Sequence, residues 1–202
     1  MITGPGFHSL KTPKRHRPLR PAVFLDRDGT LIHDKPGFYL SRPEQLRFYA
    51  GAFAALKRLQ KAGFELVVVS NQSGLARGFL DLPTLEKVHL RLLKELASHG
   101  IALAGIYFCP HGPNDGCACR KPKPTLALRA ARRHGLSVAN SFVVGDKRAD
   151  VDLAAALKIP AVHLLTGHGR HQRRSHGGEL KPAHTASSLA AAASWIIRSS
   201  RR

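Results

Sequence analysis

The chain has 202 residues and a formal net charge of +19, and 43% of its residues are hydrophobic. This length and hydrophobic content predict one globular domain, and no apolar run approaches the roughly 18 residues of a membrane helix, which excludes a membrane-spanning class. The N-terminal residues also lack the apolar segment of a secretory signal, so we expect a cytoplasmic protein. The chain has three cysteines, all between positions 109 and 119. This odd number and close spacing argue against a disulfide framework and favour a metal-binding site.

Strands and helices are predicted to alternate along the chain. Apolar runs predict strands at 22–25, 64–69, 103–108, 141–144 and 160–165, and helical spacing predicts helices at 51–61, 81–99, 124–134, 149–157 and about 187–198. Residues 31–50 show no long periodicity, and we expect a loop or hairpin there. The His-rich segment 163–184 lacks a convincing spacing of metal ligands, so we favour a solvated loop over a metal site in it. The alternation predicts an α/β fold with three layers, in which helices cover a mostly parallel sheet.

Positive charge is concentrated at the two ends of the sequence. Residues 1–20 carry five Lys or Arg and no acid, and residues 166–202 carry seven against the single Glu179. We interpret 1–20 as a basic flexible arm, 21–166 as the central domain, and 167–202 as a basic loop and a helix packed on or trailing from that domain. Basic ends bind nucleic acid non-specifically, but the lack of interleaved aromatic residues favours solvated termini.

Polar residues follow several of the predicted strands. Asp26 and Asp28 come directly after the first strand, Ser70 ends the second, and Asp146 follows the fourth. The carboxyl ends of parallel strands meet at one edge of a sheet, so we expect these side chains in one cleft. Neighbouring carboxylates repel, and oxygen-rich sites select cations such as Mg²⁺. Read alone, the Asp26–Asp28 pair is also compatible with an ordinary acidic turn.

Such a cleft can hydrolyse a phosphate ester. A carboxylate can attack phosphorus and form an aspartyl-phosphate, which divides a slow hydrolysis into two steps. We assign Asp26 as the nucleophile and Asp28 as the acid and base; Asp146 joins Asp26 on the metal, and Ser70 and Lys121 bind phosphoryl oxygens. The chain has no Walker sequence, which argues against a nucleotide-driven phosphotransferase.

Four motifs resemble, in order, those of the haloacid dehalogenase (HAD) superfamily of phosphohydrolases. They are Asp26-x-Asp28-Gly29-Thr30, Ser70-Asn71, Lys121, and Gly145-Asp146-x-x-x-Asp150, and the resemblance covers about residues 22–165. It implies a Rossmann-like HAD fold, Asp26 as nucleophile and Asp28 as acid and base. It also implies Mg²⁺ on Asp26, on the backbone carbonyl of Asp28 and on Asp146, with Asp150 in or near the metal shell.

Residues 109–119 carry the ligand set of a structural Zn²⁺ site, namely Cys109, His111, Cys117 and Cys119. The alternative is a group of unrelated buried thiols. With Arg120-Lys121-Pro122 directly after it, the cluster resembles the zinc-loop subgroup of the superfamily, which contains heptose bisphosphate and histidinol-phosphate phosphatases. The resemblance implies a zinc loop that presents Arg120 to the distal part of a substrate and Lys121 to its phosphoryl group. It also implies that Asn71, Gln72, Ser73 and Lys147 line the substrate site.

The spacing between Asp26 and Ser70 limits the size of any domain that could cover the active site. Only 43 residues separate them, and these already include a helix and a strand, so no large cap domain fits and the zinc loop and residues 33–40 must form the rim. By resemblance, the expected reaction is removal of the C7 phosphate of D-glycero-D-manno-heptose 1,7-bisphosphate. The five-residue gap between His111 and Cys117 is similar to that of histidinol-phosphate phosphatase, whose substrate is a phosphorylated amino alcohol. The open rim and the net charge also leave a polynucleotide 3′-phosphatase as an alternative. We expect a monomer with no membrane partner, and nucleic-acid binding only through the basic ends.

Overall fold

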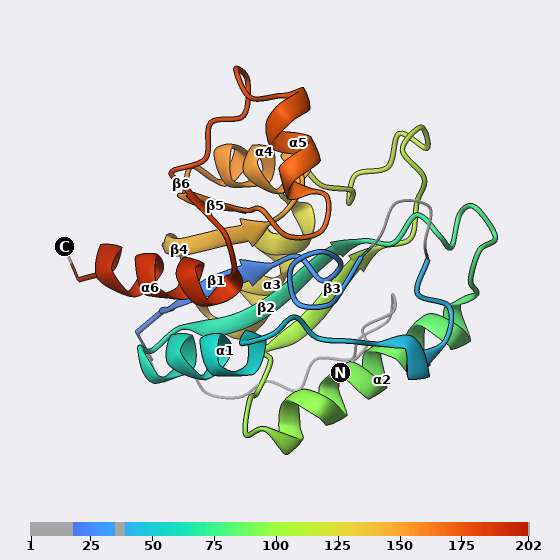
Figure 1. Cartoon of the computed structure of the whole chain (residues 1–202), viewed down its shortest axis with the longest axis horizontal. Coiled ribbons are helices and arrows are strands. Elements are labelled where there is room, and N and C mark those ends of the chain that lie inside the picture. Colours follow the sequence, from blue (N-terminus) through green and yellow to red (C-terminus); the bar gives the residue numbers. More distant parts are fainter. Residues whose placement is uncertain (1–17, 35–38, 202) are drawn as a thin grey trace.

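The architecture is an all-parallel sheet of six strands between helices (Figure 1). A computed structural model describes residues 18–34 and 39–201. Its strands follow the order β3-β2-β1-β4-β5-β6, and every neighbouring pair is parallel. The strands are β1 (Arg20–Leu25), β2 (Glu65–Asn71), β3 (Gly105–Cys109), β4 (Leu136–Gly145), β5 (Ala161–Leu164) and β6 (His184–Ala186). The order reverses between β1 and β4, and the carboxyl edge at such a switch point is where α/β sheets bind ligands.

Helices cover both faces of the sheet, as the three-layer prediction requires (Figure 1). Helices α1 (Ala52–Lys61), α2 (Leu82–Ser98) and α6 (Leu189–Ser199) share one apolar cluster with Val23 and Leu25 of β1. Helices α3 (Thr125–His134) and α4 (Arg148–Leu157) share a second cluster with Ala22 and Phe24. Alternate residues of β1 therefore serve opposite faces, which is the period of two that a strand imposes. These four β1 side chains are fully buried, so the sheet has a hydrophobic core on each face.

Local sequence signals account for several helix ends. The Asp81 carboxylate accepts a hydrogen bond from the backbone N–H of Thr84 at 2.9 Å and caps the start of α2. The Ser188 hydroxyl caps α6 in the same way, accepting from the backbone N–H of Ala191. Gly135 ends α3 in the left-handed conformation that glycine adopts without a steric penalty.

The interpretation of residues 163–184 as a solvated loop is wrong. His163 belongs to β5, inside the strand predicted at 160–165, and it is fully buried there, with Nε2 donating to the carbonyl of Gly169 at 3.1 Å. The segment then forms α5 (Gly169–Ser175), and the edge strand β6 begins at its last residue, His184. A three-residue strand is too short to show a period of two, and α5 is rich in Arg and His, so neither element has a hydrophobic pattern to detect.

Elsewhere the predicted elements lie close to their observed places. The largest shift is in β4, which begins at Leu136 rather than at residue 141. Residues 31–50 form irregular structure with one short 3₁₀ helix, η1 (Pro43–Gln45), and an isolated bridge between Ile32 and Phe48. Of the predicted basic arm, residues 1–17 lie outside the described part of the chain, and β1 begins at Arg20. No helix among the described residues is long and apolar enough to cross a membrane.

Candidate active site

The structure brings the predicted strand-end residues together at the carboxyl edge of the sheet. Asp26 directly follows β1, Ser70 lies near the end of β2, and Asp146 directly follows β4. The backbone N–H of Asp26 donates to the carbonyl of Val144 at 2.9 Å, which holds the ends of β1 and β4 side by side. All three polar side chains are at least 95% buried, a condition that charged groups tolerate only when they are paired or bind metals.

Three carboxylates gather in this cluster, and two of them contact the ammonium group of Lys121. Asp26, Asp146 and Asp150 each offer an oxygen, and these oxygens lie within 4.8 Å of one another. Lys121 Nζ lies 2.8 Å from Asp26 Oδ1 and 2.6 Å from Asp150 Oδ1, and it donates to the carbonyl of Val69 at 2.7 Å. Burial favours the neutral amine, but the charges of Asp150 and Asp26 outweigh it and raise the pKa of Lys121. Lys121 therefore stays protonated.

The donor set fits a hard divalent cation. Asp146 Oδ2 accepts from the backbone N–H of His168 at 2.7 Å, whereas its Oδ1 is buried and has no hydrogen-bond partner among the described residues. Burial and, further, the negative charge of Asp26 raise the pKa of Asp146 well above its ordinary value. The charge of Lys147 lowers the pKa of Asp146 but does not offset the effect of burial and the neighbouring carboxylates, and carboxylate oxygens are the ligands that Mg²⁺ prefers. Asp150 differs, because its two oxygens already accept from Lys121 Nζ and from the backbone N–H of Lys147.

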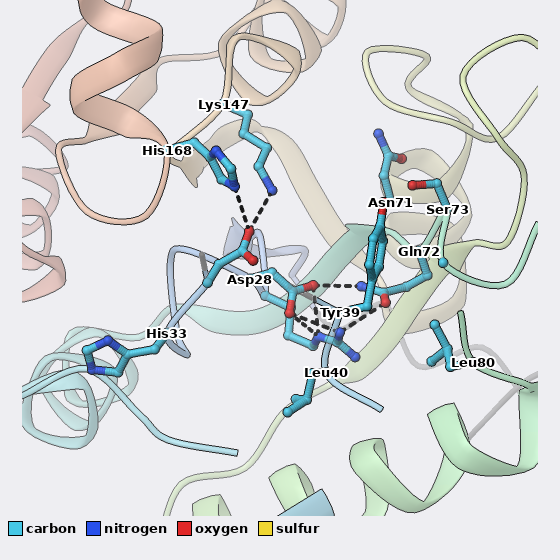
Figure 2. A pocket seen from close by; sticks show the side chains of 13 residues that line it. Asp28, His33, Tyr39, Leu40, Asn71, Gln72, Ser73, Leu80, Lys147 and His168 are labelled. Atoms are coloured by element: carbon cyan, nitrogen blue, oxygen red, sulfur yellow. Dashed lines mark hydrogen bonds and ion pairs between the residues drawn. The ribbon is translucent and has the colours of Figure 1, made fainter. Parts of the chain in front are cut away.

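Asp28 is held by residues on both sides (Figure 2). Arg27 Nε lies 3.1 Å from each Asp28 oxygen, and Arg27 NH2 lies 2.9 Å from Oδ1. Gln72 Nε2 donates to Asp28 Oδ2 and to Ser70 Oγ, both at 2.7 Å. Burial raises the pKa of Asp28, but the charge and hydrogen bonds of Arg27 lower it further, so the net shift is downward. Asp28 is ionised in the free site.

A pocket opens beside Asp28. Figure 2 shows Lys147 and His168 directed to the same point on its wall, where Lys147 Nζ and His168 Nε2 lie 3.0 and 3.2 Å from Asp34 Oδ2. Burial favours the neutral amine of Lys147, but Asp26 and Asp146 raise its pKa well above the ordinary value. The pocket also contains Asn71, Gln72, Ser73, His33, Tyr39, Leu40, Gly74 and Leu80. Residues 35–38 of the predicted rim lie outside the described chain.

Two glycines allow backbone to pack directly against Asp146. A Cβ at Gly29, where φ is +83°, would lie 2.1 Å from Asp146 Oδ2, and one at Gly167, where φ is +49°, would lie 2.4 Å from it. The Thr166 hydroxyl donates to the carbonyl of Gly29 at 2.6 Å and fastens the two loops together. The 165–168 loop thus orients Asp146, a role hidden from sequence reasoning because His168 falls in the segment interpreted as solvated.

Asn71 contacts the backbone of Lys121 rather than only lining the pocket. Its Nδ2 donates to the Lys121 carbonyl at 3.2 Å, and its Oδ1 accepts from the Lys121 N–H at 2.9 Å. This reciprocal pair fixes the peptide of Lys121 at the end of β2. Arg120, the neighbouring cation, is partly exposed and donates from NH1 to the carbonyl of His111 at 3.1 Å.

The Cys and His residues of 109–119 form a compact cluster. Sγ–Sγ distances are 3.1, 3.5 and 3.8 Å, and His111 Nδ1 lies 3.6 Å from Cys109 Sγ and 3.3 Å from Cys119 Sγ. With Zn–S bonds of about 2.3 Å and Zn–N bonds of about 2.0 Å, the edges of a tetrahedron measure roughly 3.8 and 3.5 Å. The four ligand atoms therefore fit around one Zn²⁺ ion. Burial acts against ionisation of Cys117, but backbone N–H groups lower its pKa to about 7, toward the thiolate that binds metal.

Known proteins resemble this chain in sequence. A family model described as HAD-hydrolase-like matches residues 118–192. A curated relative from Bordetella bronchiseptica is 37% identical over 176 residues, which are 87% of this chain and 97% of the relative. The chain belongs to the HAD-like hydrolases, and the family resemblance of its motifs is confirmed. That relative is named D-glycero-beta-D-manno-heptose-1,7-bisphosphate 7-phosphatase. A Helicobacter pylori protein of the same name is 43% identical over 149 residues, which are 72% of this chain and 83% of the relative.

A solved structure extends the likeness to three dimensions. The crystal structure of D,D-heptose 1,7-bisphosphate phosphatase from B. bronchiseptica, complexed with magnesium and phosphate, matches with a TM-score of 0.81 and 35% identity. The match covers 90% of this chain and 99% of that one. The Rossmann-like HAD fold is therefore confirmed, and the described residues between β1 and β2 contain no cap domain. A Campylobacter jejuni protein named histidine biosynthesis bifunctional protein HisB is 40% identical over 138 residues, which are only 39% of its own length.

Arg27 and His168 were given no role from the sequence, and Asp34 was expected only as part of the 33–40 rim. Arg27 contacts Asp28, and Asp34 and His168 form part of the pocket wall. The sequence did place Arg27 between the two aspartates, and this position could have indicated that it contacts one of them. Asp34 lies in a segment without periodicity, and nothing in the residues around it indicates that Lys147 approaches from 113 positions away.

Proposed function

We propose that this chain is a Mg²⁺-dependent phosphatase that removes the C7 phosphate of D-glycero-D-manno-heptose 1,7-bisphosphate through an aspartyl-phosphate on Asp26. The observation that carries the proposal is the Asp26 carboxylate itself, which lies beside the Lys121 ammonium and within 4.8 Å of Asp146 and Asp150 oxygens at the carboxyl edge of β1. Relatives and a solved structure that bear the name of this activity support the substrate.

In the first step, the Asp26 carboxylate attacks phosphorus and the ester oxygen of the sugar departs. Lys121, held protonated between Asp26 and Asp150, binds a phosphoryl oxygen and offsets the charge of the transition state. The Ser70 hydroxyl, which accepts from Gln72, is available to donate its own proton to another phosphoryl oxygen. The departing alkoxide takes a proton from Asp28, which borders the pocket.

In the second step, Asp28 removes a proton from the water that attacks phosphorus, and the Asp26 carboxylate is released. The ionised state of Asp28 in the free site suits this role as a base. Its role as an acid requires protonation, and the dianionic phosphoryl group that arrives beside it favours the proton-bound form.

Two metal ions complete the proposal. Asp26, Asp146 and the backbone carbonyl of Asp28 would hold Mg²⁺, which neutralises negative charge on the phosphoryl oxygens when bound. Cys109, His111, Cys117 and Cys119 would hold a structural Zn²⁺ ion that fixes the loop before Arg120 and Lys121.

The charges at the pocket favour a bisphosphate over histidinol phosphate. Lys147 lines the pocket, whereas Arg120 lies outside its lining and donates to the carbonyl of His111; we assign Arg120 to a distal phosphate. The ammonium of histidinol would need an acidic partner, but Asp34 on the pocket wall already faces Lys147 and His168. Histidinol phosphate remains the second candidate, because the HisB relative matches this chain over 138 residues.

A substrate panel tests the proposal. With Mg²⁺ present, we expect kcat/KM for phosphate release from heptose 1,7-bisphosphate to exceed that for histidinol phosphate and p-nitrophenyl phosphate by at least about a hundredfold. Equal activity on the bisphosphate and the aryl phosphate would remove the substrate assignment. Preference for histidinol phosphate would replace it with the second candidate.

A further inference from the structure

A histidine interrupts the buried apolar face of α2. His89 lies at the helical spacing of Leu85 and Leu92 and is fully buried like them. Its ring packs beside Phe108 of β3, with the centroids 5.5 Å apart. His89 Nε2 lies 3.1 Å from Arg27 NH1, and this is the polar contact of the imidazole. The side chain therefore joins α2 to the residue between the two aspartates.

The contact determines which nitrogen carries the proton. A guanidinium only donates hydrogen bonds, so Nε2 must be the acceptor and the proton must lie on Nδ1. Nδ1 is buried and has no hydrogen-bond partner in the described part of the chain. An unpartnered N–H in a core is unfavourable, and a Leu or Met would fill the same space without it. Packing alone thus does not explain a histidine here, whereas its bond to Arg27 does.

Arg27 transmits this contact to Asp28. Its guanidinium is 98% buried and divides its donors among three acceptors: the Asp28 carboxylate, Gln72 Oε1 at 3.0 Å and His89 Nε2. Arg27 Nε lies 3.1 Å from both Asp28 oxygens, so a rotation of the Arg27 side chain would move the donors that hold this carboxylate. Gln72, which directly follows β2, and His89 of α2 approach from different parts of the chain and restrict that rotation.

We propose that His89 is a positioning residue that acts through Arg27 to fix the orientation of the Asp28 carboxylate toward the leaving group. The inference rests on the proposed role of Asp28 as acid and base, but not on the identity of the sugar. Its consequence is selective: a misplaced acid slows the departure of a basic alkoxide, and it hardly affects a leaving group that departs without a proton.

Two substitutions at one position separate this role from packing. His89→Gln keeps an acceptor near the position of Nε2, whereas His89→Leu keeps the bulk and removes the acceptor. Both variants and the wild type are compared in single-turnover release of the leaving group, with Mg²⁺ and enzyme in excess. The substrates are 2,4-dinitrophenyl phosphate, p-nitrophenyl phosphate, phenyl phosphate and heptose 1,7-bisphosphate. Thermal unfolding is measured alongside.

For His89→Leu we expect a loss of about tenfold or more on phenyl phosphate and a change of less than about twofold on 2,4-dinitrophenyl phosphate. His89→Gln should restore most of the rate on the basic leaving groups. An equal loss on all aryl phosphates, or a His89→Leu enzyme with the wild-type dependence on the leaving group, would overturn the proposal. If His89→Leu does not fold, failure of His89→Gln to keep the wild-type dependence overturns it equally. Inactivity of the wild type on the bisphosphate alone would refute the proposed substrate, and the aryl series would still decide the role of His89.

Discussion

Replacing Gly29 with alanine should disable the site by moving Asp146. The new Cβ would lie 2.1 Å from Asp146 Oδ2, which is about 1.3 Å short of the 3.4 Å at which ordinary contact begins. Either the carboxylate or the 28–30 backbone must shift by about that amount. A misplacement of about 1 Å in a catalytic group can cost about a hundredfold in rate, so we expect kcat with saturating Mg²⁺ to fall by at least that factor.

A second glycine provides the matched control. Gly63 also has a positive φ of +91°, but nothing lies within 4 Å of the Cβ that alanine would add there. Both substitutions place an L-residue in the left-handed region, at a cost of about 1–2 kcal/mol in the free energy of unfolding. Only Gly29→Ala should also lose activity and Mg²⁺ affinity, measured by a Mg²⁺ titration of turnover and by urea unfolding. A Gly29→Ala enzyme with kcat within threefold of Gly63→Ala would refute the placement of Asp146 as a precise metal ligand.

Three further predictions address the nucleophile, the zinc cluster and the buried histidine. Asp26→Asn should lower turnover by at least about a thousandfold while the thermal unfolding curve stays cooperative; retained activity in a purified sample would exclude the aspartyl-phosphate route. Cys119→Ser should reduce bound zinc, measured by elemental analysis, and lower the free energy of unfolding by at least about 2 kcal/mol; an unchanged metal content would count against the site. The folded pKa of His89 is about 3, since burial and then the charge of Arg27 lower it from 6.5, so the unfolded chain binds more protons below pH 6.5 and stability falls as the pH decreases. Between pH 7 and 5 the wild type should therefore lose about 2 kcal/mol more than His89→Gln in urea unfolding, and identical losses would show that folding does not lower the pKa of His89.

Strand-end residues could be predicted from the sequence because they follow from one rule. Short apolar runs ended at Asp26, Ser70 and Asp146, and a parallel sheet brings such ends to one edge whatever lies between them. The compact cluster of Cys and His residues could also be predicted, since its members are close in the sequence. These features depend on backbone topology and on local spacing, which a linear pattern records well.

Side-chain partners from distant segments could not be predicted in the same way. His89 has the position of a core residue in the pattern of α2, and only the structure shows that its ring reaches Arg27, 62 residues away. His168 lies in a segment without hydrophobic periodicity, yet its backbone N–H contacts Asp146. Both interactions depend on how helices and loops pack over the edge of the sheet, and hydrophobic periodicity carries no information on that packing.

The reciprocal bonds between Asn71 and Lys121 hold the Lys121 peptide in place whatever the length of the 109–119 loop. They attach the peptide of Lys121 to the end of β2 independently of the residues between His111 and Cys117. Insertions or deletions in that stretch can therefore change the loop while the backbone of Lys121 keeps its place. We expect substitutions in this loop to alter substrate choice without moving the Lys121 peptide, and the loop is therefore the place to graft new specificities.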